Sequence, residues 1–205
     1  MKLSIVAEGG GMRGAYALGA IDALYSHFGL KSVDYMTGSS ASAATLAYYA
    51  AGQFYPGYYI WSNELPSPKF LSFRNILKGR PFFDIDYLVD EVFKKRIPLN
   101  ENKVKASRMR LIVPLTNAET GDAEYFNNRT KFDFFEILRA AMAMPFAYNH
   151  TVKIGEKAYL DGALTDPLPI NIPQIRESRK IIILTKPRSD SKSGISDEVR
   201  QSLLN

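Results

Sequence analysis

The fold is decided by residues 3–18, LSIVAEGGGMRGAYAL. The stretch begins with the short apolar run Leu3–Ala7, which is typical of a buried strand. Three glycines follow at residues 9–11, and from Arg13 to Phe28 apolar residues recur at helical spacing. Backbone N–H groups at such a helix start are suited to binding an anion. The stretch therefore predicts a strand, a glycine turn and a helix in direct succession.

The same pattern returns about 30 residues further on. Residues 33–37 predict a second strand, residues 38–42 (GSSAS) a second sharp turn, and residues 41–51 a second helix that ends before Gly52. Strands and helices in this order form parallel strands joined by right-handed crossovers. The sequence therefore predicts an α/β fold.

The remaining elements are less regular. Residues 54–81 contain many aromatic residues and four prolines, and they predict an irregular segment, either a packed loop or a lid. Helices are expected over residues 83–95 and 132–143, and strands over 111–115, 123–126, 157–160 and 180–185, with a glycine-containing turn at 117–122. We expect residues 1–187 to form one domain and residues 188–205 to form a polar tail or the start of a further helix.

Composition excludes several classes of protein. A chain of 205 residues that is 46% hydrophobic is expected to form a single domain with a sizeable core. No apolar stretch approaches the ~18 residues of a membrane span, and the N-terminus has no signal-peptide organisation. Zero cysteines exclude disulfides, a thiolate nucleophile and cysteine-based metal sites. We expect a cytoplasmic protein.

The formal net charge of +5 comes from basic residues gathered at residues 94–96, 103–110 and 176–192. A solvated surface is the simpler explanation. The alternative is attraction to anionic lipid headgroups, with the protein peripheral to a membrane. Nucleic-acid binding is not expected, because no known motif accompanies the charge. The oligomeric state is not readable from the sequence.

Ser40 is the candidate nucleophile. The segment from Gly38 to Ser42 resembles the nucleophile elbow G-x-S-x-G, with Ser42 in place of the last glycine. In an elbow the serine occupies a strained strand-to-helix turn, and small neighbours allow the backbone and the helix to approach closely. The alternative is a polar N-cap, because serine is a good residue at a helix start.

A nucleophilic serine needs a base, and Asp161 is the best-placed candidate. The chain has two histidines, His27 and His150, and neither follows Asp161 as the order Ser…Asp…His of α/β-hydrolases requires. Asp161 ends an expected strand, and Gly162-Ala163 then turn the backbone away. An Asx-type turn is the alternative role of this aspartate.

The first glycine turn is suited to forming an oxyanion hole. Gly9, Gly10 and Gly11 let the backbone direct its N–H groups toward one point, and the helix that starts near Gly14 adds partial positive charge. Arg13 has three candidate roles: orienting the loop, supporting negative charge, or forming a salt bridge at the helix start.

A dinucleotide site is an alternative for the same turn. Residues 9–14 also fit the fingerprint G-x-G-x-x-G, and Asp34 lies 20 residues beyond Gly14. The fingerprint places its acidic residue at the end of the second strand, whereas Asp34 falls near the start. NAD or FAD binding is therefore the weaker alternative.

Together the three motifs EGGGMRG (8–14), GSSAS (38–42) and DGA (161–163) resemble the signatures of the patatin-like phospholipase family. Residues 117–121 and 139–145 also resemble family segments. The resemblance implies a three-layer α/β/α fold with a mostly parallel central sheet, and hydrolysis of lipid acyl esters without a metal or a cofactor. It implies that Ser40 is the nucleophile and Asp161 the base of a Ser–Asp dyad, with Gly10 and Gly11 on the oxyanion loop.

Two features depart from the family pattern. Ser42 replaces the elbow glycine, so a catalytically impaired module that binds a lipid or a partner protein is an alternative function. The chain also ends soon after the expected strand 180–185, where bacterial relatives commonly continue, which allows either a fragment or a short member. The headgroup and acyl length of the substrate are not readable from the sequence.

Overall fold

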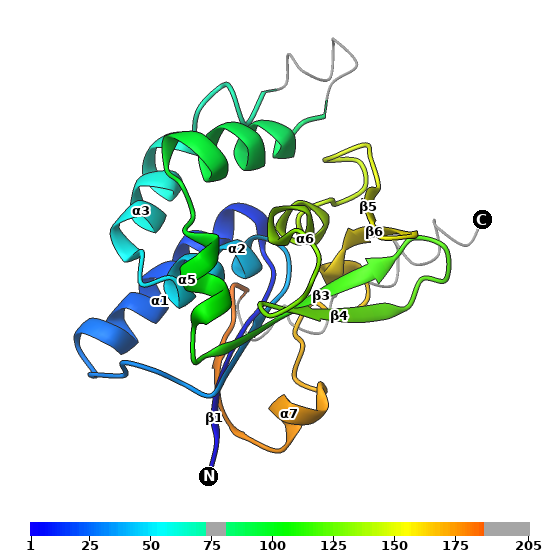
Figure 1. Cartoon of the computed structure of the whole chain (residues 1–205). Coiled ribbons are helices and arrows are strands. Elements are labelled where there is room, and N and C mark those ends of the chain that lie inside the picture. The colour runs from blue at the N-terminus through cyan, green and yellow to red at the C-terminus, as the bar shows by residue number, and fades with distance from the viewer. Residues whose placement is uncertain (73–80, 187–205) are drawn as a thin grey trace.

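A mixed sheet of seven strands organises the part of the chain that the computed structural model describes, residues 1–72 and 81–186 (Figure 1). The strand order is β5-β6-β3-β2-β1-β7, and β4 also pairs with β3. The strands are β1 (Leu3–Ala7), β2 (Tyr35–Gly38), β3 (Arg110–Asn117), β4 (Ala123–Asn127), β5 (Val152–Ile154), β6 (Lys157–Asp161) and β7 (Arg179–Ile183). The four strands β3, β2, β1 and β7 are parallel, whereas β4, β5 and β6 pair antiparallel. The predicted α/β class is confirmed.

Helices cover both faces of the sheet. They are α1 (Gly14–Ser26), α2 (Ala41–Ala50), α3 (Phe54–Tyr59), α5 (Glu101–Ala106), α6 (Phe134–Ala141) and α7 (Pro173–Arg176), with 3-10 turns η1 (Gly11–Arg13) and η4 (Gly162–Leu164) and π-helical segments η2 (Ile60–Glu64) and η3 (Tyr87–Arg96). Figure 1 shows α1, α2 and α5 on one side of β1 and α7 on the other. The larger core lies on the α1 and α2 side, and a smaller cluster joins Val6 and Ile112 to Ile172 and Ile175 at α7.

Several local predictions are confirmed. The strand at residues 3–7 has the expected bounds, and α1 and α2 lie within the expected helices. Gly121 has a φ of +74° in the turn between β3 and β4, a conformation that glycine adopts without steric cost. The prediction for residues 188–205 lies outside the described residues.

The prediction for residues 54–64 is wrong, because this segment is helical rather than irregular. Pro56 lies in the first turn of α3, where its missing N–H leaves no helical hydrogen bond unmade. The Trp61 ring of η2 packs directly over Gly14 of α1, where any side chain would overlap it. Tertiary packing on α1 therefore determines the structure of a segment whose local sequence signals are weak.

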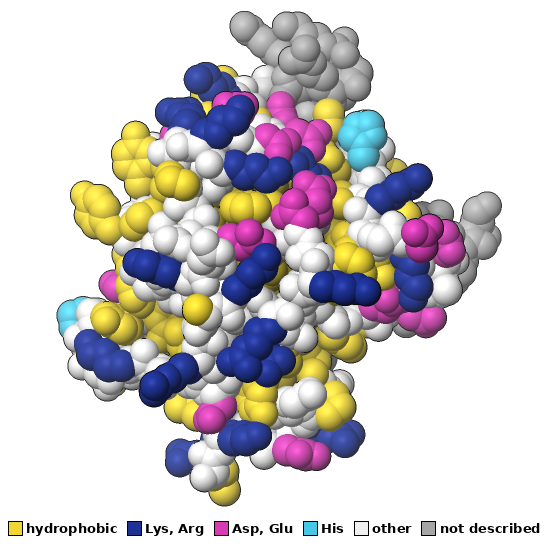
Figure 2. All heavy atoms as spheres, in the orientation of Figure 1, with side chains coloured by type: hydrophobic (Ala, Val, Ile, Leu, Met, Phe, Trp, Pro, Cys, Tyr) yellow, Lys and Arg dark blue, Asp and Glu magenta, His cyan; other side chains and the backbone are white. Residues whose placement is uncertain are grey.

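The basic residues do not form one continuous patch on the visible face. Lys94, Lys95 and Arg96 each lie within 3.0 Å of a carboxylate oxygen, those of Asp90, Glu91 and Glu64 respectively. In Figure 2 the dark blue Lys and Arg side chains are spread among acidic and polar ones. This pattern favours a solvated surface for residues 94–96. Within residues 1–72 and 81–186, no helix has the length and apolar character that a membrane span requires.

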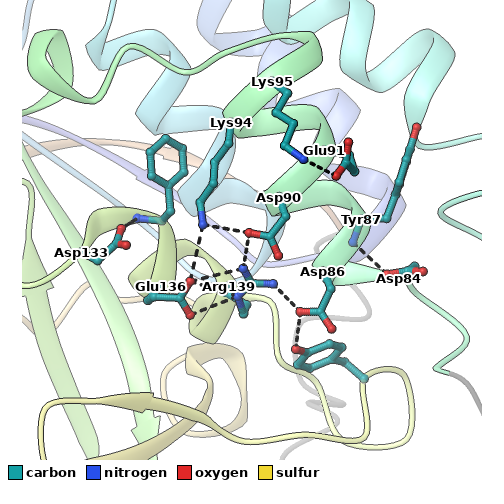
Figure 3. A network of polar contacts seen from close by, with 12 residues as sticks. Asp84, Asp86, Tyr87, Asp90, Glu91, Lys94, Lys95, Asp133, Glu136 and Arg139 are labelled. Carbon is teal, nitrogen blue, oxygen red and sulfur yellow. Dashed lines mark hydrogen bonds and ion pairs between the residues drawn. The ribbon is translucent and has the colours of Figure 1, made fainter.

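Arg139 of α6 joins two helices through a network of ion pairs (Figure 3). Its guanidinium contacts Asp86, Asp90 and Glu136, although the Arg139 side chain is only 9% exposed. Tyr148 donates a hydrogen bond of 2.8 Å to Asp86. The network attaches η3 to α6, and both segments belong to the wall of the main core.

We expect Arg139→Met to lower the free energy of unfolding by about 2 kcal/mol, less than for a fully buried pair because the carboxylates are partly hydrated. For a chain of this size that corresponds to a melting temperature about 4–8 °C lower. Lys95→Met is the control, because it removes an exposed pair and should change stability by no more than about 0.5 kcal/mol. Equal shifts for the two variants, measured by thermal denaturation, would contradict this assignment.

Candidate active site

The glycine turn and the serine turn leave the sheet at the same edge. Strands β1 and β2 are parallel neighbours, with Val6 opposite Thr37 and Ala7 opposite Gly38. The carboxyl ends of adjacent parallel strands meet at one edge of a sheet, where α/β proteins bind ligands. Residues 9–11 and residues 39–42 are therefore adjacent, although about 30 residues separate them.

Asp161 reaches this edge of the sheet because two strands, β2 and β6, pair with the same edge of β3. Ile112 pairs with both β2 and β4, and Leu115 pairs with both β4 and β6. Because β4 occupies one edge of β3, β2 and β6 must both lie along the other edge. Strand β2 ends at Gly38, and β6 runs beside the remainder of β3 until it ends at Asp161. The end of β6 therefore faces the turn that follows β2.

The Ser40 hydroxyl donates a hydrogen bond of 2.7 Å to Oδ2 of Asp161. Ser40 has a φ of 56° and a ψ of −135°, a conformation that costs a non-glycine residue about 1–3 kcal/mol. It occupies the N-cap position of α2, but its side chain makes no capping hydrogen bond. The hydroxyl therefore points to Asp161 rather than to the helix start, which argues against the N-cap alternative.

The Asp161 carboxyl is fully buried. Burial raises its pKa to about 7, and the hydrogen bonds from the Ala163 N–H and the Ser40 hydroxyl oppose this rise. Ala163 N donates to Oδ1 at 2.9 Å, so the aspartate also forms the Asx-type turn that the sequence allowed. Gly162 follows because a Cβ there would lie 2.0 Å from the Pro114 carbonyl oxygen.

The glycine loop presents free backbone donors to the same space. The N–H groups of Gly10 and Gly11 make no hydrogen bond to any residue in the described ranges, and both residues line a cavity together with Ser40 and Asp161. The N–H of Ala41 is equally free within those ranges, and Ala41 lines the same cavity. Ala41 was not singled out from the sequence, although the residue after an elbow serine commonly supplies such a donor.

The other predicted residues have different surroundings. Arg13 is exposed at the cavity rim and forms no ion pair with the described residues, so the salt-bridge alternative has no support there. Gly14 packs under Trp61 and does not line the cavity. Ala163 lines it, and Gly9 approaches Ala163 closely.

Ser42 fits at the elbow because Gly38 has no side chain. A Cβ on Gly38 would lie 3.0 Å from the Ser42 Cβ, so the two positions share the space for one side chain. The Ser42 hydroxyl donates a hydrogen bond of 2.7 Å to the carbonyl oxygen of Glu8. The substitution of the elbow glycine is therefore accommodated without displacing the turn.

The cavity has a volume of about 370 Å³ and extends along α2. Ala41, Ala44, Thr45 and Tyr48 line it from one face of the helix, which runs about 12 Å from Ser40 to Tyr48. Most of the other lining side chains are apolar, among them Leu18, Ile60, Trp61, Leu65, Phe70 and Leu88. The α3–η2 region, which the sequence presented as irregular, thus supplies part of the cavity wall. A concave, mostly apolar site with a few convergent polar groups is typical of ligand binding.

The alternatives based on histidine and on dinucleotide binding find no support in this geometry. His27 and His150 are exposed, and neither lines the cavity. Asp34 lies before β2, where its carboxylate accepts a hydrogen bond of 2.8 Å from the N–H of Leu3. It is therefore at the opposite end of the strands from the glycine loop, too far away for a ribose bound there.

Comparisons with known proteins find two similar chains. The YjjU protein of Escherichia coli (strain K12) is 24% identical over 188 residues, which are 89% of this chain and 51% of that protein. The crystal structure of VipD from Legionella pneumophila matches with a TM-score of 0.60 at 15% identity, covering 94% of this chain and 52% of that chain. The chain thus spans about half the length of each, and the likeness to VipD concerns the fold alone.

A family model described as patatin-like phospholipase matches residues 5–173. This range contains all three motifs and most of the sheet. The chain belongs to the patatin-like phospholipase family.

Proposed function

We propose that this chain is a serine-dependent lipid acyl hydrolase in which Ser40 is the nucleophile and Asp161 the base. The observation that carries the proposal is the hydrogen bond of 2.7 Å from Ser40 Oγ to a fully buried carboxylate at an apolar cavity. Membership of the patatin-like phospholipase family supports hydrolysis of lipid esters in general.

In the first step, Asp161 accepts the Ser40 proton as Oγ attacks the ester carbonyl carbon. The carbonyl π bond opens to give a tetrahedral oxyanion. The bond to the alcohol oxygen then breaks, and the protonated Asp161 returns its proton to the departing alcohol. The products of this step are the free alcohol and an acyl ester on Ser40.

In the second step, water releases the acyl group. Asp161 takes a proton from the water as its oxygen attacks the acyl carbon. The resulting oxyanion collapses, and Ser40 Oγ leaves with the proton that Asp161 returns. The fatty acid is released and the enzyme is restored.

The oxyanion of both steps is proposed to be stabilised by backbone N–H groups. Gly10, Gly11 and Ala41 are the candidates, because these residues line the cavity and their N–H groups are free within the described ranges. Such donors act without reorganisation, and removing one from an oxyanion hole typically costs about 10²–10³ in kcat. The N-terminus of α2 adds partial positive charge near Ala41.

The raised pKa of Asp161 supports its role as the base. An ordinary aspartate, with a pKa of about 3.9, is a weak base toward a serine hydroxyl. Burial brings the pKa to about 7, so the carboxylate binds a proton more tightly near neutral pH.

We expect Ser40→Ala and Asp161→Asn to abolish hydrolysis of p-nitrophenyl esters, because each removes a reacting group. A fluorophosphonate probe should attach to Ser40 in the wild-type protein only. Ser178→Ala, which removes a buried hydroxyl bonded to Ser4, serves as the control and should keep full activity. Full activity in either site variant, or a folded wild-type protein that resists the probe, would refute the dyad and favour a binding module.

We expect kcat/KM to rise with pH and to reach half its maximum near pH 7, because Asp161 must be ionised to accept the proton. The measurement is the kcat/KM profile for a neutral ester between about pH 5 and pH 9. A profile that is flat across this range would exclude a base with the pKa of buried Asp161.

The same carboxyl should make stability depend on pH. Its pKa is higher in the folded than in the unfolded chain, so the stabilisation is complete below about pH 4 and is lost as pH rises to about 7. Asp161→Asn lacks this loss, so its melting temperature relative to wild type should increase over that range, by the equivalent of a few kcal/mol. A difference in melting temperature that does not vary with pH would contradict the raised pKa.

The apolar cavity is proposed to hold the acyl chain. Burial contributes about 0.8 kcal/mol per CH₂ group, so octanoate, with four more than butyrate, should gain about two hundredfold in kcat/KM. Ala44→Phe places a ring in the cavity beside α2 and should remove most of that gain. The activity of the variant on butyrate is the internal control. An unchanged ratio of octanoate to butyrate activity would mean that the chain binds elsewhere.

A further inference from the structure

We propose that Ser42, the residue that departs from the elbow pattern, is a positioning residue that holds the oxyanion loop beside the nucleophile. The inference rests on the proposed function, because it concerns the donors that stabilise the oxyanion. It assigns a role in catalysis to the residue that otherwise argues for an impaired site.

The Ser42 hydroxyl connects two of the three motifs directly. Ser42 lies in the first turn of α2, two residues after Ser40, and is fully buried. Its Oγ donates to the carbonyl oxygen of Glu8, the last residue before the three glycines, at 2.7 Å. The element that carries the nucleophile is therefore bonded to the strand end from which the donor loop begins.

This bond fixes one side of the peptide unit between Glu8 and Gly9. The other side is also held, because the N–H of Gly9 donates to the Pro167 carbonyl oxygen at 3.1 Å. A peptide unit is planar, and its C=O and N–H point in opposite directions when it is trans. With a partner on each side, the unit cannot rotate without breaking a buried hydrogen bond.

The next peptide unit is held by the end of β7. The Thr185 hydroxyl donates to the Gly9 carbonyl oxygen at 2.9 Å, and the Glu8 carboxylate accepts from the N–H groups of Thr185 and Lys186 at 2.8 and 3.2 Å. Since the Gly9 carbonyl points to Thr185, the N–H of Gly10 points away from it. Hydrogen bonds thus hold two successive peptide units, and together these units set the direction of the Gly10 N–H, the first free donor of the loop.

Anchoring matters because three consecutive glycines are conformationally permissive. Donors stabilise a transition state only when they are directed at the developing charge before the reaction begins. Among the described residues, the bond from Ser42 is the only one to these two peptide units that comes from the helix carrying Ser40. We therefore expect it to set the distance between the Ser40 oxygen and the Gly10 and Gly11 N–H groups.

Kinetic measurements distinguish a positioning role from a purely structural one. Loss of the Ser42 hydroxyl should lower kcat, because the donors act on the oxyanion, and leave KM nearly unchanged. The pH at half-maximal kcat/KM should also stay the same, because Ser42 makes no hydrogen bond to Asp161.

The test compares Ser42→Ala with Ser4→Ala on p-nitrophenyl octanoate. Ser4 is also fully buried and lies on β1, but its hydroxyl bonds to Ser178 at the end of the strand away from the site. We expect Ser42→Ala to lower kcat about ten- to a hundredfold, less than the loss of a whole donor, with KM within about twofold. Ser4→Ala should keep the wild-type kcat. Ser42→Gly makes the same deletion with the residue of the elbow pattern, should the alanine variant fail to fold.

If kcat of Ser42→Ala or Ser42→Gly matches that of Ser4→Ala, Ser42 has no positioning role. A shift of the pH midpoint would also overturn the inference, because it would locate the effect at Asp161. Ser40→Ala distinguishes a failure of the proposed function from a failure of the positioning role of Ser42. An active Ser40→Ala protein refutes the proposed function, whereas an inactive one beside an unimpaired Ser42→Ala refutes only the role of Ser42.

Discussion

The sharing of one edge of β3 between β2 and β6 is the constraint on which the site depends. Strand β2 occupies the first part of that edge and β6 the last part, while β4 covers the opposite edge. Strand β2 stops while its neighbour β3 continues, so the turn after β2 is exposed beside β3. Strand β6 pairs with the last part of the same edge of β3 and ends against this turn. Gly162 permits the close approach, since any side chain there would collide with the Pro114 carbonyl. Without this register, the hydroxyl of Ser40 and the carboxyl of Asp161 would not lie within hydrogen-bonding distance.

The polar groups around the site are of two kinds: hydroxyls that are paired with backbone carbonyls, and N–H groups that are free within the described ranges. Buried polar groups in proteins are almost always paired. The hydroxyls of Ser39 and Ser42 follow this rule, because Ser42 donates to the Glu8 carbonyl oxygen and Ser39 donates to the carbonyl oxygen of Asp166, which lies shortly after the DGA motif. The N–H groups of Gly10, Gly11 and Ala41 are free within the described ranges and border the cavity. These two serine hydroxyls therefore connect the elbow to neighbouring segments, and the free N–H groups are where a ligand oxygen is expected to bind.

Burial of Asp161 connects the stability of the fold with the proposed chemistry. The same desolvation that raises the pKa of the carboxyl to about 7 makes its ionised form costly in the folded chain. The strained conformation of Ser40 adds a second local cost, which the surrounding packing must sustain. Both free-energy costs arise at the residues proposed for catalysis. The network around Arg139 lies further away, where it stabilises the packing of α6 and η3.

Local sequence patterns were enough to predict the α/β class, the first strand, both glycine-bounded helices and the family resemblance. These follow from signals contained within a few residues, such as apolar periodicity, glycine turns and small residues around an elbow. The choice of Asp161 over a histidine also came from the sequence, through the order of residues alone. Tertiary structure decided the rest: the helical wall at residues 54–64, the donor at Ala41 and the bond from Ser42 to Glu8. The physical reason is that each depends on contacts between segments far apart in the chain. Ser40 and Asp161 lie 121 positions apart in the sequence, and nothing local in the sequence indicates the 2.7 Å that separates their oxygens in the folded protein.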